Sequence, residues 1–166
     1  MPESTPVSDY LLELAIPHRV FSHPGPIHSL EQAARERGQL PEQVVRSIVF
    51  RIGQGEYVMV LAAGPEQISW PALRSYLGQS RLTMASQEEV LAVTGYETGA
   101  VSPFGLPRQM RILVDKKLLI QDEVSIGSGV RGTTVILRVE DLMKALENME
   151  VEEFLSSSSQ DENLPG

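Results

Sequence analysis

The composition of the loop from Gly95 to Gly105 is typical of a site that binds its ligand through main-chain groups. It carries three glycines and one proline within eleven residues, between a predicted helix and a predicted strand. Glycine loses more conformational entropy on folding than other residues, so a cluster of it indicates a backbone path that side chains would obstruct. Such a path either brings main-chain N–H groups close to a ligand or makes a tight connection without one. The loop alone leaves both interpretations open.

The sequence lacks the common motifs of catalytic side chains. The chain has no cysteine, which excludes disulfides, thiol nucleophiles and thiolate metal sites. Its three histidines (His18, His23 and His28) are five residues apart, which is not the i, i+4 spacing of a helical zinc site, so we expect no metal. Ser102 is followed by Pro103, unlike the nucleophile of a Gly-x-Ser-x-Gly elbow. Without a P-loop or a dinucleotide fingerprint, no cofactor is expected either.

The elements that must position the loop are predicted from periodicity and caps. Ser29 begins a helix with Gln32 at capping-box spacing and Gly38 as its stop. Ser86 and Glu89 form a second capping box, and the helix that they begin ends near Thr94. Further helices are expected over 8–14 and 139–149, another is expected to begin at residue 70, and a short one near residue 41. Strands are expected over 18–22, 47–52, 56–62, 81–85, 110–114, 123–126 and 134–138.

These elements predict a mixed α/β (α+β) fold. Helices and strands alternate irregularly, and residues 47–62 read as an antiparallel hairpin. We therefore expect a single domain with a curved, barrel-like mixed sheet flanked by helices. Its expected limits are an N-terminal arm over 1–9, the folded domain over 10–149, and an acidic, Ser-rich, disordered tail over 150–166.

Charge and hydropathy limit the partners. The net charge is −8, but residues 147–166 hold six acids and no base, which leaves 16 acids against 14 bases in residues 1–146. A nearly neutral body permits a local contact with nucleic acid but not a broad basic footprint. The chain has neither a signal-peptide pattern at its N-terminus nor an apolar run long enough to span a membrane, so a cytoplasmic location is expected.

Three motifs occur together in order. They are Pro41 to Phe50, leading from a helix into a strand; Thr94-Gly95-Tyr96 with Gly99-Ala100-Val101-Ser102-Pro103-Phe104-Gly105; and Gly127-Ser128-Gly129-Val130-Arg131-Gly132 before the last strand and a helix at Glu140. In this arrangement, residues 10–147 resemble the YbaK/prolyl-tRNA-synthetase-associated (bacterial trans-editing) domain family. The Gly-x-x-x-Pro element from Gly99 to Pro103 is the most specific part of the resemblance.

The resemblance implies an aminoacyl-tRNA deacylase. Such a domain hydrolyses the ester of a mischarged tRNA, often tRNA for proline, in a pocket without a protein nucleophile or metal. Its partner is the tRNA acceptor end, with a prolyl-tRNA synthetase or a homodimer as further candidates. An aminoacyl ester is already activated, so holding it beside water or a ribose hydroxyl supplies much of the rate. Backbone N–H groups of residues 99–103 would stabilise the developing oxyanion.

The resemblance also assigns residues. Arg46, Gly99, Ala100 and Ser102 form the expected catalytic set, and the expected substrate-binding residues are His23, Ser47, Pro103, Phe104, Gly105, Gly129, Arg131 and Thr134. Arg46 stands where family members generally carry lysine; it keeps the charge, but its planar guanidinium is not equivalent. Many relatives have an aromatic residue near the position of His23, and some have an acid or histidine near that of Thr134.

Plainer roles remain open for several of these residues. Arg46 could be a solvated charge or pair with Glu42. Ser102 could form a turn within its own loop, and Asp115 is interpreted as a turn residue rather than a general base. For the whole chain, the alternatives are a binding module for a tRNA end or an amino acid that has lost turnover, and a hydrolase of small aminoacyl esters that does not use RNA.

Overall fold

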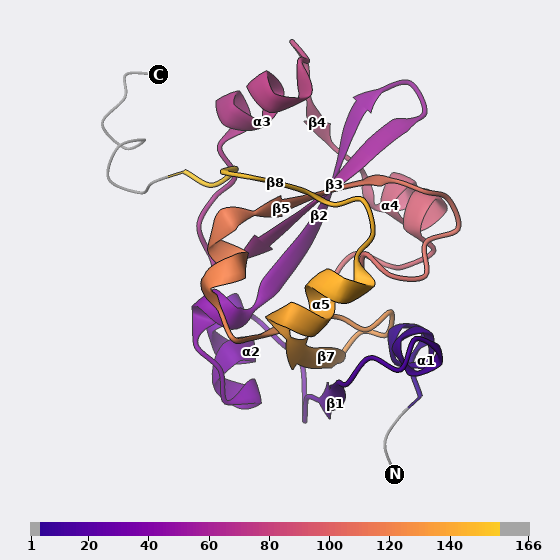
Figure 1. The fold of residues 1–166 in the computed structure, drawn as a ribbon, viewed down its shortest axis with the longest axis vertical. Helices are drawn as coiled ribbons and strands as arrows, with labels where there is room; N and C mark the ends of the chain where they lie inside the picture. Colours follow the sequence, from indigo (N-terminus) through magenta and orange to yellow (C-terminus); the bar gives the residue numbers. More distant parts are fainter. Residues whose placement is uncertain (1–3, 157–166) are drawn as a thin grey trace.

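The computed structural model describes residues 4–156, and its α-helices and strands up to α5 follow the predicted order (Figure 1). The helices are α1 (Pro6–Glu13), α2 (Leu30–Arg37), α3 (Trp70–Leu77), α4 (Gln87–Thr94) and α5 (Val139–Ala145), with 3₁₀ turns η1 (Pro41–Gln43) and η2 (Lys116–Ile120). The strands are β1 (Arg19–Ser22), β2 (Val45–Gly53), β3 (Glu56–Ala63), β4 (Thr83–Met84), β5 (Arg111–Asp115), β6 (Glu123–Gly127), β7 (Thr133–Arg138) and β8 (Glu150–Glu152). None of the helices in this described part is long and apolar enough to cross a membrane.

Local chemistry sets the helix ends where the sequence predicts them. The Ser29 hydroxyl accepts from the Gln32 N–H at the start of α2, and Gly38 ends that helix at φ +70°. Ser86 and Glu89 form the reciprocal capping box of α4, and Gly95 ends α4 at φ +78°. Left-handed backbone of this kind is readily adopted by glycine, so both stop signals are confirmed.

The strands form two sheets rather than a barrel. One sheet has the order β1-β7-β6 and the other β4-β2-β3-β5-β8. Within residues 4–156, one isolated β-bridge joins the two sheets, in which Val44 pairs with Ser125 in parallel. The mixed α+β single domain is confirmed, but closure of the sheet is not found, because β2 already pairs with β4 at Phe50 and Arg51 and only the start of β2 is left to approach β6.

A large apolar core joins the two sheets. It includes Leu61 and Val114 of the larger sheet, Ile126 and Val135 of the smaller one, and Leu11 of α1. Each of these side chains is at most 1% exposed. In Figure 1, α1 and α2 lie at the lower end of the molecule, on opposite sides of β7, and α3 lies at the upper end.

The folded part extends beyond the expected limits of 10–149 at both ends. Helix α1 begins at Pro6, and β8 pairs in parallel with β5. Phe154 is fully buried against a second core under α3, and its N–H donates to Asp115 Oδ1 at 2.7 Å. The Asp115 Oδ2 also accepts from the Lys117 N–H, which agrees with its interpretation as a turn residue. Of the disordered tail predicted over 150–166, residues 150–152 form β8, and residues 157–166 lie outside the described residues.

Candidate active site

The segment Gly99–Pro103 is held as a defined turn. The Ala100 N–H donates to the Glu97 carbonyl at 2.9 Å, and the Ala100 carbonyl accepts from the Gly129 N–H at 3.0 Å. Gly99 has φ +96°, which an L side chain rarely adopts. Arg131 Nε donates to the Thr98 carbonyl at 3.1 Å and lies 3.4 Å from the Glu97 carboxylate. The predicted residues Gly99, Ala100, Gly129 and Arg131 are therefore neighbours.

The turn packs directly on the end of β6. A Cβ placed on Gly127 would lie 2.0 Å from the Val101 carbonyl oxygen, so only glycine allows this approach. Within residues 4–156, the N–H groups of Val101 and Ser102 donate to no protein acceptor. Both residues are buried, and an unpaired buried N–H is costly unless a ligand or water accepts from it. These two N–H groups are candidate oxyanion donors of the loop.

The rest of the loop is fixed from inside the protein. Ser102 is fully buried, and its hydroxyl oxygen accepts from the Phe104 N–H at 3.1 Å, so it forms a turn within its own loop. The Tyr96 hydroxyl donates to the Phe104 carbonyl at 2.5 Å. Gly105 has φ +71°, and a Cβ there would lie 2.8 Å from that hydroxyl. Phe104 belongs to the core and stacks on Tyr10, with ring centroids 5.5 Å apart.

Arg46 is half-buried and bound to carbonyls. Its Nε donates to the Gly64 carbonyl at 2.8 Å, and its other edge donates to the Glu66 carbonyl. Burial lowers the pKa of the Arg46 guanidinium, and the Glu66 carboxylate opposes that shift. No ion pair joins Arg46 to Glu42 in the described part of the chain. The neighbouring Ser47 hydroxyl is buried and makes no hydrogen bond there.

The bridge between the sheets brings β2 toward the loop. Val44 and Ser125 pair in parallel, and Arg46 and Gly127 each lie two residues farther along their strands. Because side chains alternate along a strand, Arg46 and the Cα–H of Gly127 that faces Val101 point to the same side of the sheets. This is the side away from the shared core.

Two further predicted residues lie on the same side of the smaller sheet. Thr134 pairs with Gly127 and donates its hydroxyl to the Ile126 carbonyl at 2.7 Å, so it is satisfied and only 2% exposed. His23 follows β1, where its N–H donates to the Gly132 carbonyl at 2.8 Å. The His23 side chain is fully buried beside Glu36, with Nδ1 at 2.6 Å from Oε1.

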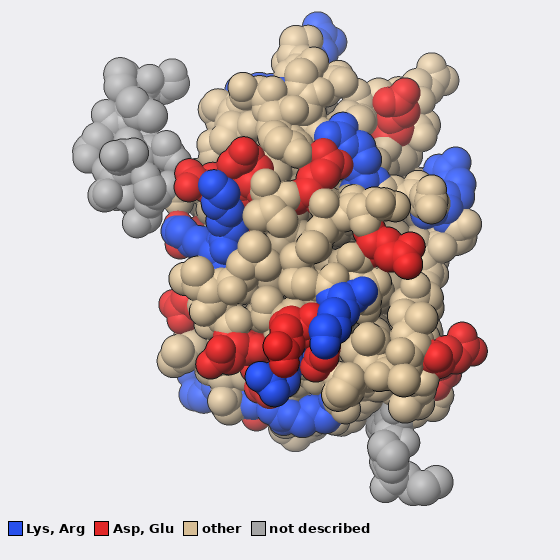
Figure 2. Space-filling model, in the orientation of Figure 1, with Lys and Arg blue, Asp and Glu red and all other residues tan. Residues whose placement is uncertain are grey.

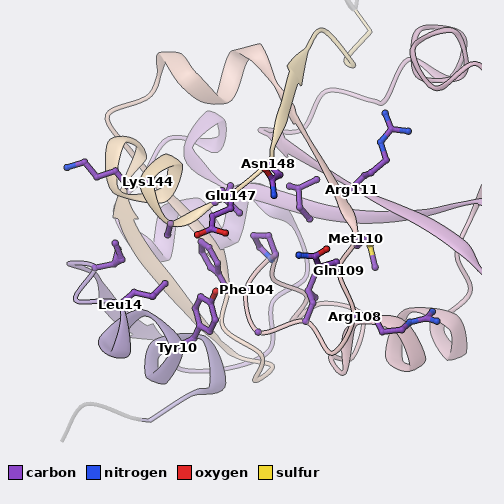
Figure 3. A pocket seen from close by; sticks show the side chains of 17 residues that line it. Tyr10, Leu14, Phe104, Arg108, Gln109, Met110, Arg111, Lys144, Glu147 and Asn148 are labelled. Carbon is purple, nitrogen blue, oxygen red and sulfur yellow. The ribbon is translucent and has the colours of Figure 1, made fainter.

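A cavity lies beside the end of the loop, at residues 103–106. It has a volume of about 650 Å³ and is formed by α1, the end of α5 and residues 103–112. Tyr10, Phe104 and Gln109 lie around its middle in Figure 3, whereas Lys144, Arg108 and Arg111 point away from it. Pro103, Phe104 and Gly105 line it, but Arg46, His23, Ser47 and Thr134 do not. The predicted residues are therefore not all brought together around this cavity.

The described residues also bear on metal binding and on charge. Residues 4–156 contain no group of three or more His, Asp or Glu side chains that could hold a metal ion. On the face shown in Figure 2, basic and acidic side chains are interspersed, without a continuous basic surface. Any contact with nucleic acid on this face is therefore local.

Comparison with known proteins places the chain among editing domains. It is 26% identical to the prolyl-tRNA editing protein ProX of Acetoanaerobium sticklandii over 137 residues, covering 80% of this chain and 83% of that one. It is 27% identical to the multifunctional Ser/Thr-tRNA deacylase ProXp-y of Escherichia coli over 130 residues, covering 76% and 77%.

Larger proteins and solved structures match as well. The chain is 29% identical to the proline–tRNA ligase of Thermosipho melanesiensis over 109 residues, which are 66% of this chain but only 19% of the ligase. The fold matches a crystal structure described as a candidate trans-editing enzyme for prolyl-tRNA synthetase, with a TM-score of 0.82, 24% identity, and coverage of 92% and 96%. The model of the aminoacyl-tRNA editing domain matches residues 24–145. The chain belongs to the aminoacyl-tRNA editing domain family.

Proposed function

We propose that this chain is an aminoacyl-tRNA deacylase that acts in trans, in the cytoplasm, on the acceptor end of mischarged tRNA. The observation that carries the proposal is the family match over residues 24–145. Relatives of similar length, rather than the ligase alone, bear names of editing enzymes. The N–H groups of Val101 and Ser102, which have no acceptor among the described residues, would stabilise the negative charge that develops in such a reaction.

The reaction requires no protein nucleophile. Water adds to the ester carbonyl carbon, and the bond from that carbon to the ribose oxygen then breaks. The ribose oxygen takes up a proton, and the amino acid leaves as a free acid. Negative charge develops on the carbonyl oxygen, where the Val101 and Ser102 N–H groups would donate. The neighbouring ribose hydroxyl would help to hold the water, and the fixed turn would keep the ester and the water at reacting distance.

Arg46 would hold the acceptor end of the tRNA. Its guanidinium is fixed by the Gly64 and Glu66 carbonyls, which leaves its positive charge without a carboxylate at ion-pair distance among the described residues. A guanidinium can contact a ribose oxygen or a phosphate from such a position. Ser47, whose buried hydroxyl lacks a protein partner, would contribute a polar contact nearby.

A second function, binding without turnover, is favoured by one observation. The Gly64 and Glu66 carbonyls already accept from Nε and one terminal nitrogen of Arg46. The Arg46 side chain is therefore restricted in extending toward the ester, as a lysine at this position would. The protein would then bind uncharged tRNA or an amino acid and hydrolyse nothing.

A panel of purified mischarged tRNAs distinguishes the two functions. A deacylase releases labelled amino acid from at least one tRNA, whereas a binding module binds tRNA and releases none. The same panel tests Arg46. We expect Arg46→Ala to lower the deacylation rate by about 10- to 100-fold, the usual effect of losing a hydrogen bond to a charged group, and Arg46→Lys to keep much of the rate. Equal rates for Arg46→Ala and wild type would remove Arg46 from the mechanism.

A further inference from the structure

Arg37, at the end of α2, is held by two side chains from other elements. Its Nε donates to His23 Nε2 at 3.0 Å, and its NH1 donates to the Ser125 hydroxyl at 2.8 Å. His23 is itself oriented by Glu36, whose Oε1 lies 2.6 Å from His23 Nδ1. Gln32 Nε2 donates to the other oxygen of Glu36 at 2.9 Å. Four polar side chains thus fix the direction of one guanidinium.

This guanidinium has no counter-charge at ion-pair distance in the described residues, and the Glu36 carboxylate opposes the effect of burial on its pKa only from farther away. No carboxylate of residues 4–156 forms an ion pair with Arg37, because Glu36 is turned to His23 and Gln32. Burial lowers the pKa of the Arg37 guanidinium to about 10, so it remains charged at neutral pH. Buried charges in proteins are normally paired, since desolvation without a partner is costly. For both Arg37 and Arg46, burial is the main influence on the guanidinium and brings its pKa below the ordinary value.

Ser125 connects Arg37 to the candidate active site. It accepts from Arg37, pairs with Val44 in the bridge between the sheets, and lies two residues before Gly127. Its side chain therefore points to the same side as Arg46 and the Val101 carbonyl. Thr134 and His23 also lie on this side. Two guanidiniums without a carboxylate at ion-pair distance thus lie on the same side of the sheets as the Val101 carbonyl.

We propose that Arg37 forms an anion subsite for a backbone phosphate of the tRNA 3′ end, with His23 and Glu36 as positioning residues. The inference rests on the proposed function for the identity of the RNA. Nε and NH1 already bind protein, which leaves the NH2 edge and one NH1 hydrogen for phosphate oxygens. In the neutral tautomer with a proton on Nδ1, His23 donates to Glu36 and accepts from Arg37, so one imidazole fixes the whole arrangement.

Binding of an uncharged RNA minihelix ending in cytidine-cytidine-adenosine tests the subsite without requiring hydrolysis. We expect Arg37→Gln to weaken binding about ten-fold or more. We also expect it to reduce the slope of log K against log salt concentration by about 0.7, the value for one single-strand phosphate contact. Arg35→Gln is the matched control, because Arg35 lies on the same helix and is exposed without an ion pair in the described chain. It should change the affinity and the slope much less.

The positioning role has its own readout. His23→Gln keeps a side-chain acceptor for Arg37 and should keep most of the minihelix affinity, whereas His23→Phe removes the acceptor and should reproduce Arg37→Gln. Thermal melting of each variant identifies loss of folding. If His23→Phe is unfolded, the comparison of Arg37→Gln with Arg35→Gln still decides the proposal.

Two results would overturn the inference. One is equal affinity and equal salt slope for Arg37→Gln and Arg35→Gln. The other is that Arg37→Gln binds the minihelix with unchanged affinity, while the free amino acid inhibits deacylation by this variant less than it inhibits the wild type. That result would mean that the anion bound by Arg37 is a carboxylate. Neither result affects the deacylation panel. Conversely, the minihelix could bind in a way that depends on Arg37 while no mischarged tRNA is hydrolysed. That outcome would reject the proposed deacylase function and support the proposed anion subsite.

Discussion

Replacing Gly127 with alanine tests whether the turn at Val101 is held where the reaction needs it. The added Cβ would lie 2.0 Å from the Val101 carbonyl oxygen and 2.9 Å from the Ala100 carbonyl carbon. Ordinary contact begins near 3.4 Å, so the turn would have to retreat by roughly 1.4 Å. These atoms are backbone, and no rotamer change relieves the clash. Overpacking of this kind costs about 1–3 kcal/mol, and we expect the upper part of that range.

Two assays measure the effect. A loss of about 2–3 kcal/mol lowers the melting temperature by roughly 5–10 °C in a chain of this size. A displacement of about 1 Å at reacting groups lowers the rate about 100-fold, so single-turnover deacylation should fall by that order while minihelix binding changes less. Gly53→Ala is the control, because a Cβ there meets its nearest neighbour at 3.8 Å and its φ is not positive. Wild-type melting and wild-type rate in Gly127→Ala would refute a turn fixed by β6.

Two further predictions follow from contacts around the loop and α2. Tyr96→Phe leaves the buried Phe104 carbonyl without its donor at 2.5 Å, so we expect a loss of about 1–3 kcal/mol in chemical denaturation; an unchanged midpoint would show that the carbonyl finds another donor. The hydrogen bonds from Gln32 and then His23 lower the pKa of Glu36. The ionised Glu36 carboxylate therefore contributes its full stabilisation above its pKa in the unfolded chain, near 4.3. This contribution is lost as the pH falls through the lower pKa of Glu36 in the folded protein. Wild type should exceed Glu36→Gln in stability at pH 7, and the difference should shrink below about pH 4; a difference independent of pH would contradict this reasoning.

The sequence predicts features whose causes are local. Ser29 with Gly38 and Ser86 with Gly95 limit their helices through contacts within a few residues, and these caps occur as expected. The family was also predicted correctly from the order of three motifs, and the family model confirms it. The order of the elements predicts the fold class. The separation of the two sheets depends on the pairing of β2 with β4, which cannot be predicted from a local sequence pattern.

The missed features depend on contacts between distant residues. Arg37 lies next to the predicted helix stop Gly38 and is not singled out by any sequence pattern, and only folding brings it to Ser125, which is 88 residues away. Glu150–Glu152 was included in an acidic tail, because charge is visible in the sequence and parallel pairing with β5 is not. The sequence signal that was available is Phe154, a large apolar residue inside an acidic stretch.

The pairing of β5 with β8 has a consequence for synthesis of the protein. Residues 111–115 acquire their outer neighbour only from residues 150–152, and the second core is sealed by Phe154. During translation, β5 therefore remains an open edge until residues 150–154 have left the ribosome. An exposed edge strand is a template for association with other chains, so the unfinished protein is the form most in need of a chaperone.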